Sequence, residues 1–219
     1  MGNKRKQFLV AGLGRFGASV ATTLQSLGCD VLAIDDNENL VQSLSGSLSY
    51  VVCGNAADEQ TLRNLNAAEV DVAVVAIGAL ESNMMCVLML KEMGVPVVVV
   101  KAINELHGKM AAKIGADKVI YSEMDMGRRV AHNLVASNVV DYLELSQHIS
   151  VVTLTLPPEF AGMNLIEANL RQRYDVSVVA INRGDKTIVN PPAKTVFAAG
   201  DELLVLGTHK AINKLWELL

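Results

Sequence analysis

Three glycines with the spacing G-x-G-x-x-G stand at Gly12, Gly14 and Gly17, directly after the apolar run FLVA. In such a turn the first glycine permits the tight bend, the second lets the backbone approach a pyrophosphate, and the third lets a helix pack closely on its strand. Phosphate would then be bound by the free N–H groups at the start of that helix. The spacing predicts a nucleotide site, although the motif alone is weakly specific.

Two charged side chains narrow the type of nucleotide. Asp35 ends the second predicted strand, where a carboxylate accepts hydrogen bonds from ribose hydroxyls and repels a 2′-phosphate, so NADP is disfavoured. Arg15 lies inside the glycine turn, and a guanidinium there suits a polyphosphate that it can bind bidentately. The alternative interpretations are a helix-capping aspartate and a solvated loop cation.

Three further segments follow predicted strands: CGNAAD, AIGA and VKAIN. Ligands of open α/β sheets bind at the carboxyl ends of the strands, so these segments are expected at one rim. Asn55 could read an adenine edge, residues 77–79 could pass beneath the sugar, and Lys101 could reach phosphate. Taken singly, Asn55 fits a turn and Lys101 a solvated strand end equally well, but together they favour a site.

An alternation of β-branched apolar runs with amphipathic segments must position these residues. Strands are predicted at Gln7–Ala11, Asp30–Ile34, Tyr50–Cys53, Val72–Ile77, Val97–Lys101 and Lys118–Tyr121, and helices at Phe16–Leu27, Glu38–Leu44, Glu59–Leu65, Ser82–Met93 and Glu105–Ile114. Strict alternation forces parallel pairing, with helices on both faces of the sheet. Residues 1–125 are therefore expected to form an α/β domain, a Rossmann-type doubly wound parallel sheet.

The rhythm changes after Glu123. Met126 to Leu145 is typical of one long helix, with an apolar face at Met126, Val130, Leu134 and Val135 that Val139 and Leu143 continue. Residues 126–147 are thus expected to form a crossover helix. Residues 148–219 predict a small α+β C-terminal domain of four strands and two helices, with a turn at residues 183–185. A domain of about 70 residues is marginal alone, so we expect it to pair with a copy of itself.

Bulk properties exclude several classes of protein. No apolar run approaches the length that spans a bilayer, and the start MGNKRK lacks the apolar core of a secretory signal. The net charge of −4 argues against a chain-wide nucleic-acid footprint. Cys29, Cys53 and Cys86 show no C-x-x-C spacing, which is typical of reduced thiols in the cytosol. We expect a soluble cytoplasmic protein.

The chain lacks the groups that a hydride-transfer enzyme needs. Such an enzyme places an acid or base beside the nicotinamide, but His107, His132, His148 and His209 stand at unrelated spacings. We therefore expect a binding module and no enzyme. An NAD(H)-dependent oxidoreductase or redox sensor on the same fold is the alternative, and a transcriptional repressor would need a DNA-binding element that no segment provides.

The motifs GLGRFG, the aspartate at the second strand end, the NA pair, AIGA, VKA and EMDMG occur in this order. With them the whole chain resembles the RCK proteins (regulators of conductance of K⁺, of the TrkA family), and within them the gating subunits of Ktr-type bacterial potassium uptake systems. The resemblance implies a homo-oligomer, an octameric ring, docked on the cytoplasmic face of a membrane potassium-transporting subunit of the KtrB or TrkH type. ATP would favour the conducting state and ADP the inactive state.

The resemblance also implies roles for single residues. Arg15 would meet the terminal phosphate of ATP held by a neighbouring subunit, and Glu123 would coordinate a divalent or monovalent cation between subunits. The nucleotide-binding residues carried over by position are Gly12, Gly14, Arg15, Phe16 and Gly17 in the turn, Asp35, Asp36 and Asn37 at the ribose, Asn55 and Ala56 at the adenine, Ile77, Gly78 and Ala79 at the sugar–phosphate, and Lys101, Ala102, Ile103, His107 and Glu123 at the phosphate end.

The C-terminal domain resembles the part of the family that binds cyclic di-AMP at a dimer interface. The residues carried over are Leu165, Ile166, Asn169, Arg171, Ser177 and Pro192, with Arg171 for phosphate. Ser177 departs from the pattern, which has asparagine. Serine is shorter and has one donor against an amide's two, which implies a weakened or absent site. An ordinary amphipathic helix followed by a core strand is the alternative.

Overall fold

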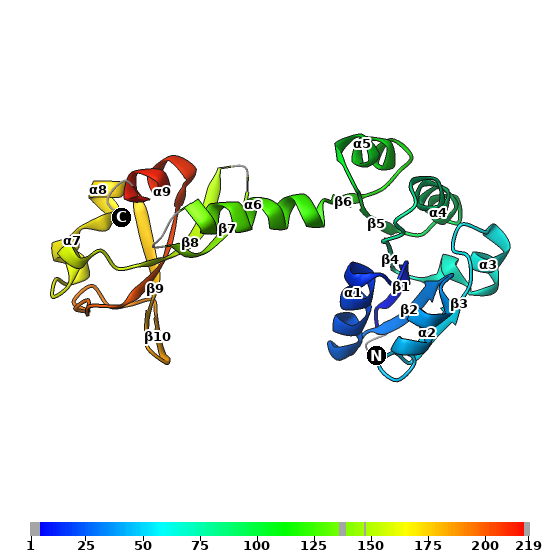
Figure 1. The fold of residues 1–219 in the computed structure, drawn as a ribbon, viewed down its shortest axis with the longest axis horizontal. Coiled ribbons are helices and arrows are strands. Elements are labelled where there is room, and N and C mark those ends of the chain that lie inside the picture. The colour runs from blue at the N-terminus through cyan, green and yellow to red at the C-terminus, as the bar shows by residue number, and fades with distance from the viewer. Residues whose placement is uncertain (1–4, 136–138, 147, 217–219) are drawn as a thin grey trace. The chain divides into compact units, whose positions relative to one another are not determined.

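The computed structural model describes residues 5–135, 139–146 and 148–216. The chain divides into two compact units, Met1–Met124 and Asp125–Leu219, and each is described by itself (Figure 1). Within the described ranges, no helix is both long and apolar enough to cross a membrane.

The first unit alternates strands and helices along the chain. Its strands are β1 (Gln7–Ala11), β2 (Asp30–Asp35), β3 (Tyr50–Cys53), β4 (Val72–Val75), β5 (Val97–Lys101) and β6 (Lys118–Ile120). Its helices are α1 (Arg15–Ser26), α2 (Glu38–Leu44), α3 (Glu59–Asn64), α4 (Leu80–Glu92) and α5 (Glu105–Lys113), with a 3-10 turn at Ala67–Glu69. The strands pair in parallel in the order β3-β2-β1-β4-β5-β6.

Alternate residues of the central strands pack on opposite faces of this sheet. Leu9 and Ala11 of β1 belong to the apolar cluster with α3, α4 and α5, whereas Val10 belongs to the cluster with α1 and α2. Figure 1 shows α1 and α2 on one side of the sheet and α4 and α5 on the other. Because successive side chains of a strand point to opposite faces, the buried residues Leu9 to Ala11 supply both layers. The predicted doubly wound fold is confirmed.

The chain continues through α6 (Ser122–Val135) into a second sheet. Its elements are β7 (Val139–Glu144), β8 (Ile149–Thr155), a 3-10 turn at Pro158–Phe160, α7 (Leu165–Ala168), α8 (Leu170–Tyr174), β9 (Val176–Arg183), β10 (Lys186–Val189), β11 (Glu202–Thr208) and α9 (His209–Trp216). The strands are antiparallel in the order β10-β9-β11-β8-β7. Gly184 and Asp185 form the turn between β9 and β10, as predicted.

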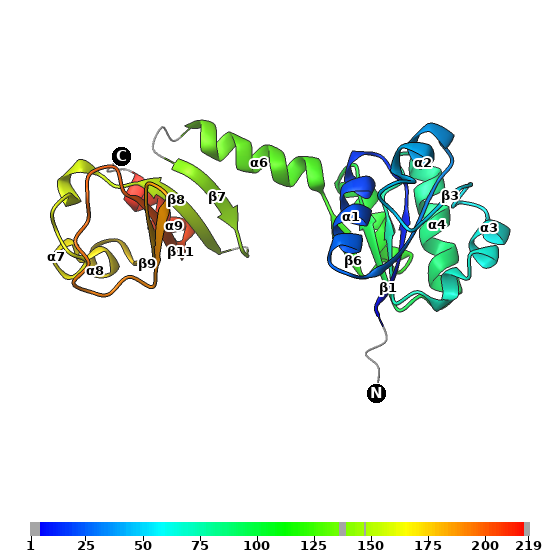
Figure 2. The same cartoon turned by 90° about the horizontal axis from the view of Figure 1, so that it is seen from below.

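The prediction of one helix over Met126–Leu145 is wrong in its second half. α6 ends at Val135, and β7 follows as an edge strand paired with β8 (Figure 2). Val139 and Leu143 happen to continue the helical spacing, but the β-branched and aromatic residues of VVDYLE favour a strand, and pairing with β8 decides the outcome. The predicted crossover segment 126–147 therefore contains a strand. Residue 147 lies outside the described residues, and the domain limits at 125 and 147 stay predictions.

Two arginine–aspartate pairs brace the second unit. Arg129 on α6 binds Asp141 on β7 through two hydrogen bonds, Nε–Oδ1 at 2.8 Å and Nη2–Oδ2 at 2.5 Å. Arg183 binds Asp201 in the same bidentate way, at 2.8 and 2.7 Å. Asp201 is only 1% exposed, and the Arg183 guanidinium holds the pKa of this carboxyl below its usual value. Because the backbone N–H of Ala198 also donates to it, the buried charge is well satisfied.

Candidate functional site

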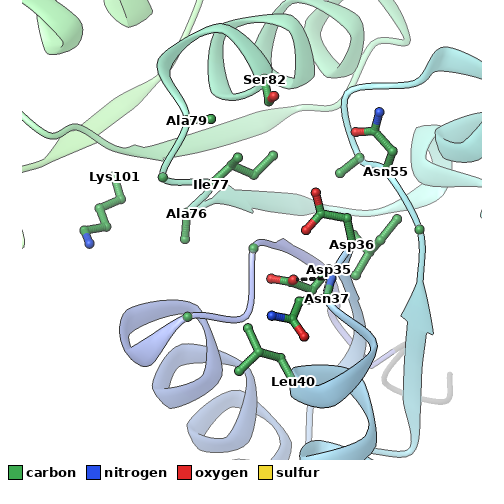
Figure 3. Close-up of a pocket in the computed structure, with 16 residues that line it drawn as sticks. Asp35, Asp36, Asn37, Leu40, Asn55, Ala76, Ile77, Ala79, Ser82 and Lys101 are labelled. Atoms are coloured by element: carbon green, nitrogen blue, oxygen red, sulfur yellow. Dashed lines mark hydrogen bonds between the residues drawn. The ribbon is translucent and has the colours of Figure 1, made fainter.

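A cleft of about 450 Å³ opens where β1 to β5 end (Figure 3). The parallel strands bring their following loops to one edge, as expected for an open α/β sheet. The predicted site residues that line it are Gly12, Gly14, Asp35, Asp36, Asn37, Asn55, Ala56, Ile77, Gly78, Ala79 and Lys101. The structure thus brings four separate sequence motifs and Lys101 to one cavity.

The glycine turn is shaped by close backbone approaches. Gly12 has φ +92°, and a Cβ there would lie 2.7 Å from the carbonyl carbon of Ala76. A Cβ on Gly17 would overlap the carbonyl oxygen of Gly12. A Cβ on Gly14 would have no other atom within 4 Å, and Gly14 lines the cleft. The three positions therefore match the tight bend, the free approach and the close helix packing that the motif predicts.

Asp35 joins the glycine turn to the start of α2. Its Oδ2 accepts the N–H of Leu13 at 2.5 Å, and its Oδ1 accepts the N–H of Asn37 at 2.8 Å. An ionised carboxylate has about four acceptor positions, so each oxygen keeps capacity for a hydroxyl donor. Asn37 in turn caps α2 by accepting from Asn39. Asp35 is therefore held rigidly in the cleft wall while still able to bind a ligand.

The polar groups are spread along the length of the cleft. Figure 3 shows Asn55 and Lys101 at opposite ends of the labelled set, with Asp35, Asp36 and Asn37 between them. Asn55 accepts the N–H of Ala57 through its Oδ1, so it is a turn residue and also lines the cleft. The amide nitrogen of Asn55 is the group that it could offer to a base. This order suits a ligand with a base at one end and anionic groups at the other.

The cationic end of the cleft is built around Lys101. Its Nζ forms an ion pair with Glu123 Oε1 at 2.6 Å and lies 5.8 Å from the centre of the Phe16 ring. Ser122 Oγ donates to the other oxygen of Glu123 at 2.8 Å. Lys101, and with it Ser122, hold the pKa of Glu123 at about 2. Phe16 and Glu123, both predicted site residues, thus contact Lys101 without lining the cleft.

The remaining predicted residues lie around the rim. Arg15 is the first residue of α1 and is exposed, and its side chain has no hydrogen bond or ion pair to the part of the chain that the structure describes. Gly17 and Ala102 are buried. Ile103 is half exposed on the loop after β5, whereas His107 is 1% exposed and contacts Asn83 and Ile103. His107 is therefore buried and does not line the cleft.

Sequence reasoning missed five residues that line the cleft. They are Ile34, Leu40, Gly54, Ala76 and Ser82. Gly54 and Ala76 stand inside the segments CGNAAD and AIGA without having been singled out, and Ile34 directly precedes Asp35. β4 is shorter than predicted, which frees Ala76 for the rim. Leu40 and Ser82 lie one turn into α2 and α4, and helical spacing from Asn37 and Ala79 could have indicated both.

The residues predicted for cyclic di-AMP lie on separate elements of the second unit. Leu165 and Ile166 are on α7, Arg171 is exposed on α8, Ser177 is exposed on β9, and Pro192 follows β10. Asn169 adopts a left-handed conformation between α7 and α8, with φ 48°. Its Nδ2 donates to Gln172. Their role in binding cyclic di-AMP stays a prediction.

No group of three or more His, Cys, Asp or Glu side chains in the described ranges is placed to hold a metal ion.

Comparison with known proteins bears on the whole chain. The TrkA-N domain model matches residues 8–122, and the TrkA-C domain model matches residues 149–219. The chain is 40% identical over 211 residues to the Ktr system potassium uptake protein C of Bacillus subtilis (strain 168), a match that covers 96% of each chain. The chain belongs to the KtrA-like proteins of the TrkA family.

Other relatives of this KtrA-like protein agree. It is 35% identical over 215 residues to the Ktr system potassium uptake protein A of Vibrio alginolyticus, covering 97% of this chain and 98% of the relative. The GsuK channel bound to NAD superposes on all of this chain with a TM-score of 0.69 at 18% identity. The KtrA-like chain spans 40% of that longer channel, and the likeness shows the fold. The resemblance inferred from the motifs is confirmed.

The Lys101–Glu123 pair of this KtrA-like protein can be tested by titration. The pKa of Glu123, ordinarily 4.5, is lowered to about 2 by Lys101 and Ser122. Because the folded pKa is depressed, the stabilisation is present above pH 4.5 and is lost as the pH falls through about 2. In Lys101→Met the pKa of Glu123 should rise from about 2 towards 4.5, and the hydrogen bond from Ser122 should keep it below 4.5, as measured by carboxylate ¹³C NMR. Lys109→Met is the control, and an unchanged Glu123 titration in Lys101→Met would contradict the pairing.

Proposed function

We propose that this chain is the gating subunit of a bacterial potassium uptake system, in which ATP or ADP bound in the cleft controls potassium flux through a membrane partner. The observation that carries the proposal is the cleft itself, with Asp35 at its middle and Lys101 at one end, in a chain that matches a Ktr potassium uptake protein along 96% of its length. Asp35 suits ribose hydroxyls, and Lys101 suits phosphate. The protein would then work at the cytoplasmic face of the membrane, held there by a partner of the KtrB or TrkH type.

The proposed switch depends on the one phosphoryl group by which ATP differs from ADP. A ligand shifts a conformational equilibrium only by its differential affinity for the two states. Arg15, exposed and without a partner in the described ranges, would meet the terminal phosphate of a nucleotide in a neighbouring subunit. Glu123 would repel that phosphate directly, but a cation bridging the two reverses the sign. Such an arrangement makes the ATP-bound ring differ from the ADP-bound ring without hydrolysis.

A ring requires surfaces for other copies of the chain, and α6 offers one. Met126, Val130 and Leu134 are 54%, 48% and 80% exposed and follow helical spacing, while the Val135 side chain lies outside the described residues. We expect light scattering to show an oligomer, an octamer in the proposed ring. Val130→Glu should reduce its mass, whereas Leu27→Glu, at a residue 72% exposed on another helix end, should not. A monomer with and without nucleotide would exclude the ring.

The second unit is proposed to bind cyclic di-AMP weakly, through Arg171 and phosphate. Arg171→Ala should then abolish binding of cyclic di-AMP and leave ATP affinity intact, because Arg171 and the residues that line the cleft lie in different units. Ser177→Asn should strengthen binding, since an amide has two donors where serine has one. Calorimetry with the parent and both variants tests this. Failure of Ser177→Asn to bind at high micromolar ligand would remove the site from consideration.

Two measurements, nucleotide binding and potassium flux, test the proposed function against the alternative of an NAD(H)-dependent oxidoreductase or redox sensor. Calorimetry should compare ATP, ADP, NAD and NADPH, with NAD included because the structurally similar GsuK channel is described as bound to NAD. The proposal expects ATP and ADP to bind more tightly than NADPH, and potassium flux through liposomes containing the partner to differ between ATP and ADP. Equal flux with both nucleotides, or hydride transfer to a substrate, would favour the alternative.

A further inference from the structure

Two buried polar side chains lie behind the cleft, and the switch proposed above uses neither. Asn83 on α4 is 0% exposed, and His107 on α5 is 1% exposed. His107 Nε2 lies 3.1 Å from Asn83 Oδ1, and Asn83 Nδ2 donates to the carbonyl of Ile77 at 2.9 Å. The N–H of Ile103 donates to His107 Nδ1 at 3.3 Å. Buried polar groups are costly unless bonded, and here both ring nitrogens and both amide atoms have partners.

These three hydrogen bonds, from Ile103 through His107 and Asn83 to the Ile77 carbonyl, form a chain that we call the relay. The direction of each bond follows from the backbone groups at its two ends. A backbone N–H can only donate, so Nδ1 of His107 must be the unprotonated acceptor facing Ile103. The proton of the neutral ring is then on Nε2, which donates to Asn83 Oδ1. The Ile77 carbonyl can only accept, which orients the Asn83 amide in the same sense. The relay therefore requires neutral His107 in a single tautomer.

The relay joins two loops that flank the cleft. Ile77, followed by Gly78 and Ala79, lies in the cleft wall after β4. Ile103 lies two residues after Lys101, the cation at the end of the cleft. The ladder between β4 and β5 ends at the pair Val75 and Val100, so it does not reach either loop. The buried side chains connect the two loops beyond the last paired strand residues.

We propose that Asn83 and His107 are positioning residues that hold two loops at a fixed separation, and that protonation of His107 releases them and weakens nucleotide binding. The two loops are the one after β4 that contains Ile77 (the Ile77 loop) and the one that follows Lys101 at the end of β5 and contains Ile103 (the Lys101 loop). The proposal rests on the nucleotide site proposed above and adds a regulation of it. A proton on Nδ1 would face the N–H of Ile103, so two donors would oppose each other and the link would break. The same proton leaves the Nε2 contact with Asn83 in place, so the Lys101 loop is the one released.

The expected pH range follows from the surroundings of His107. The groups that contact the ring, the Asn83 amide and the Ile103 N–H, are uncharged, and burial lowers the pKa of His107 below its usual 6.5. Because the neutral form is favoured in the relay, the link is intact at neutral pH and is lost as the pH falls below 6.5. Nucleotide affinity should fall over the same range.

The first arm of the test uses the nucleotide-free protein. Hydrogen–deuterium exchange should be followed at peptides that cover residues 101–104 in the parent and in Asn83→Ala. Asn83 makes no bond to Ile103 in the relay, yet Asn83→Ala should raise exchange at the Ile103 amide roughly tenfold, because His107 loses its second anchor. Unchanged exchange there overturns the relay, whether or not nucleotide binds.

The second arm measures ADP affinity by calorimetry from about pH 8 to about pH 5. As the pH falls over this range, the ADP affinity of the parent should decrease roughly tenfold more than the titration of the nucleotide's own phosphate accounts for. His107→Gln should remove the extra loss, and Asn83→Asp should move its midpoint to higher pH, because a buried carboxylate beside Nε2 favours the charged ring. His148→Gln, at an exposed histidine, is the matched control and should follow the parent.

The outcomes separate this proposal from the proposed function. If the parent binds no nucleotide but exchange at residue 103 responds to Asn83→Ala, the nucleotide function fails and the relay stands. If nucleotide binds and the pH profile of His107→Gln equals that of the parent, the relay does not govern the site and the proposal is overturned.

Discussion

Asp35→Ala should lower the affinity for both ATP and ADP by about 1.5 to 3 kcal/mol, or roughly ten- to a hundredfold in Kd. The carboxylate accepts from Leu13 and Asn37 and lines the cleft, so alanine removes the expected ribose acceptor and also the link between the glycine turn and the start of α2. The same change removes the charge that repels a 2′-phosphate. Calorimetry should therefore show NADPH losing less affinity than ATP, or gaining some.

Asp30→Ala is the matched control for this prediction. Asp30 begins the same strand and is exposed, and among the described residues its side chain forms only a 3.8 Å ion pair with Arg5, at the opposite end of the strand from Asp35. It should bind nucleotides as the parent does, and thermal unfolding of both variants checks that they are folded. ATP affinity that survives Asp35→Ala, or a parent that prefers NADPH, would contradict the assignment of the cleft.

Arg15→Ala should leave ADP affinity nearly unchanged and abolish most of the difference in potassium flux between ATP and ADP. Arg15 is exposed at the first residue of α1, beside the turn but outside the cleft wall. If its guanidinium reaches the terminal phosphate of a neighbouring subunit's ATP, it makes two charge-assisted hydrogen bonds that ADP cannot receive. Each such bond contributes on the order of 1.5 to 3 kcal/mol to the free energy by which the ATP-bound and ADP-bound states differ. Flux into liposomes containing the membrane partner measures the difference.

Two further variants sharpen this experiment. Arg15→Lys keeps the charge but loses the bidentate geometry, so it should give an intermediate response. Arg63→Ala removes an exposed arginine that pairs with Glu59 on its own helix, and it should respond as the parent does. An Arg15→Ala protein that distinguishes ATP from ADP like the parent would place the phosphate sensor elsewhere.

The first unit could be predicted almost entirely from its sequence, because local pattern and final packing agree there. β1, β3 and β5 begin and end where their apolar runs do, and Gly12 and Asp35 follow from motif spacing. The second unit shows the opposite case. Residues 139–144 suit a helix by spacing and a strand by side-chain type, and only pairing with β8, distant in the sequence, decides between them.

The site was predictable at its rim but not behind it. Strand ends, glycine spacing and the family resemblance together indicated most of the residues that line the cleft, whereas the Asn83–His107 contact joins two helices and has no signature in either. The family resemblance placed His107 at the phosphate end, and the structure adds that its ring is buried. The ion pair between Lys101 and Glu123 likewise depends on the end of β5 meeting the start of α6.

The bidentate pair between Arg129 and Asp141 gives α6 a mechanical character. It fastens the middle of the helix to the edge strand β7, whose ladder with β8 runs from Val139 to Glu144. A helix attached in this way is coupled to the strand by a side-chain contact as well as through the connecting chain. A movement of α6 that keeps this pair intact would therefore also move β7, the strand at one edge of the five-stranded sheet.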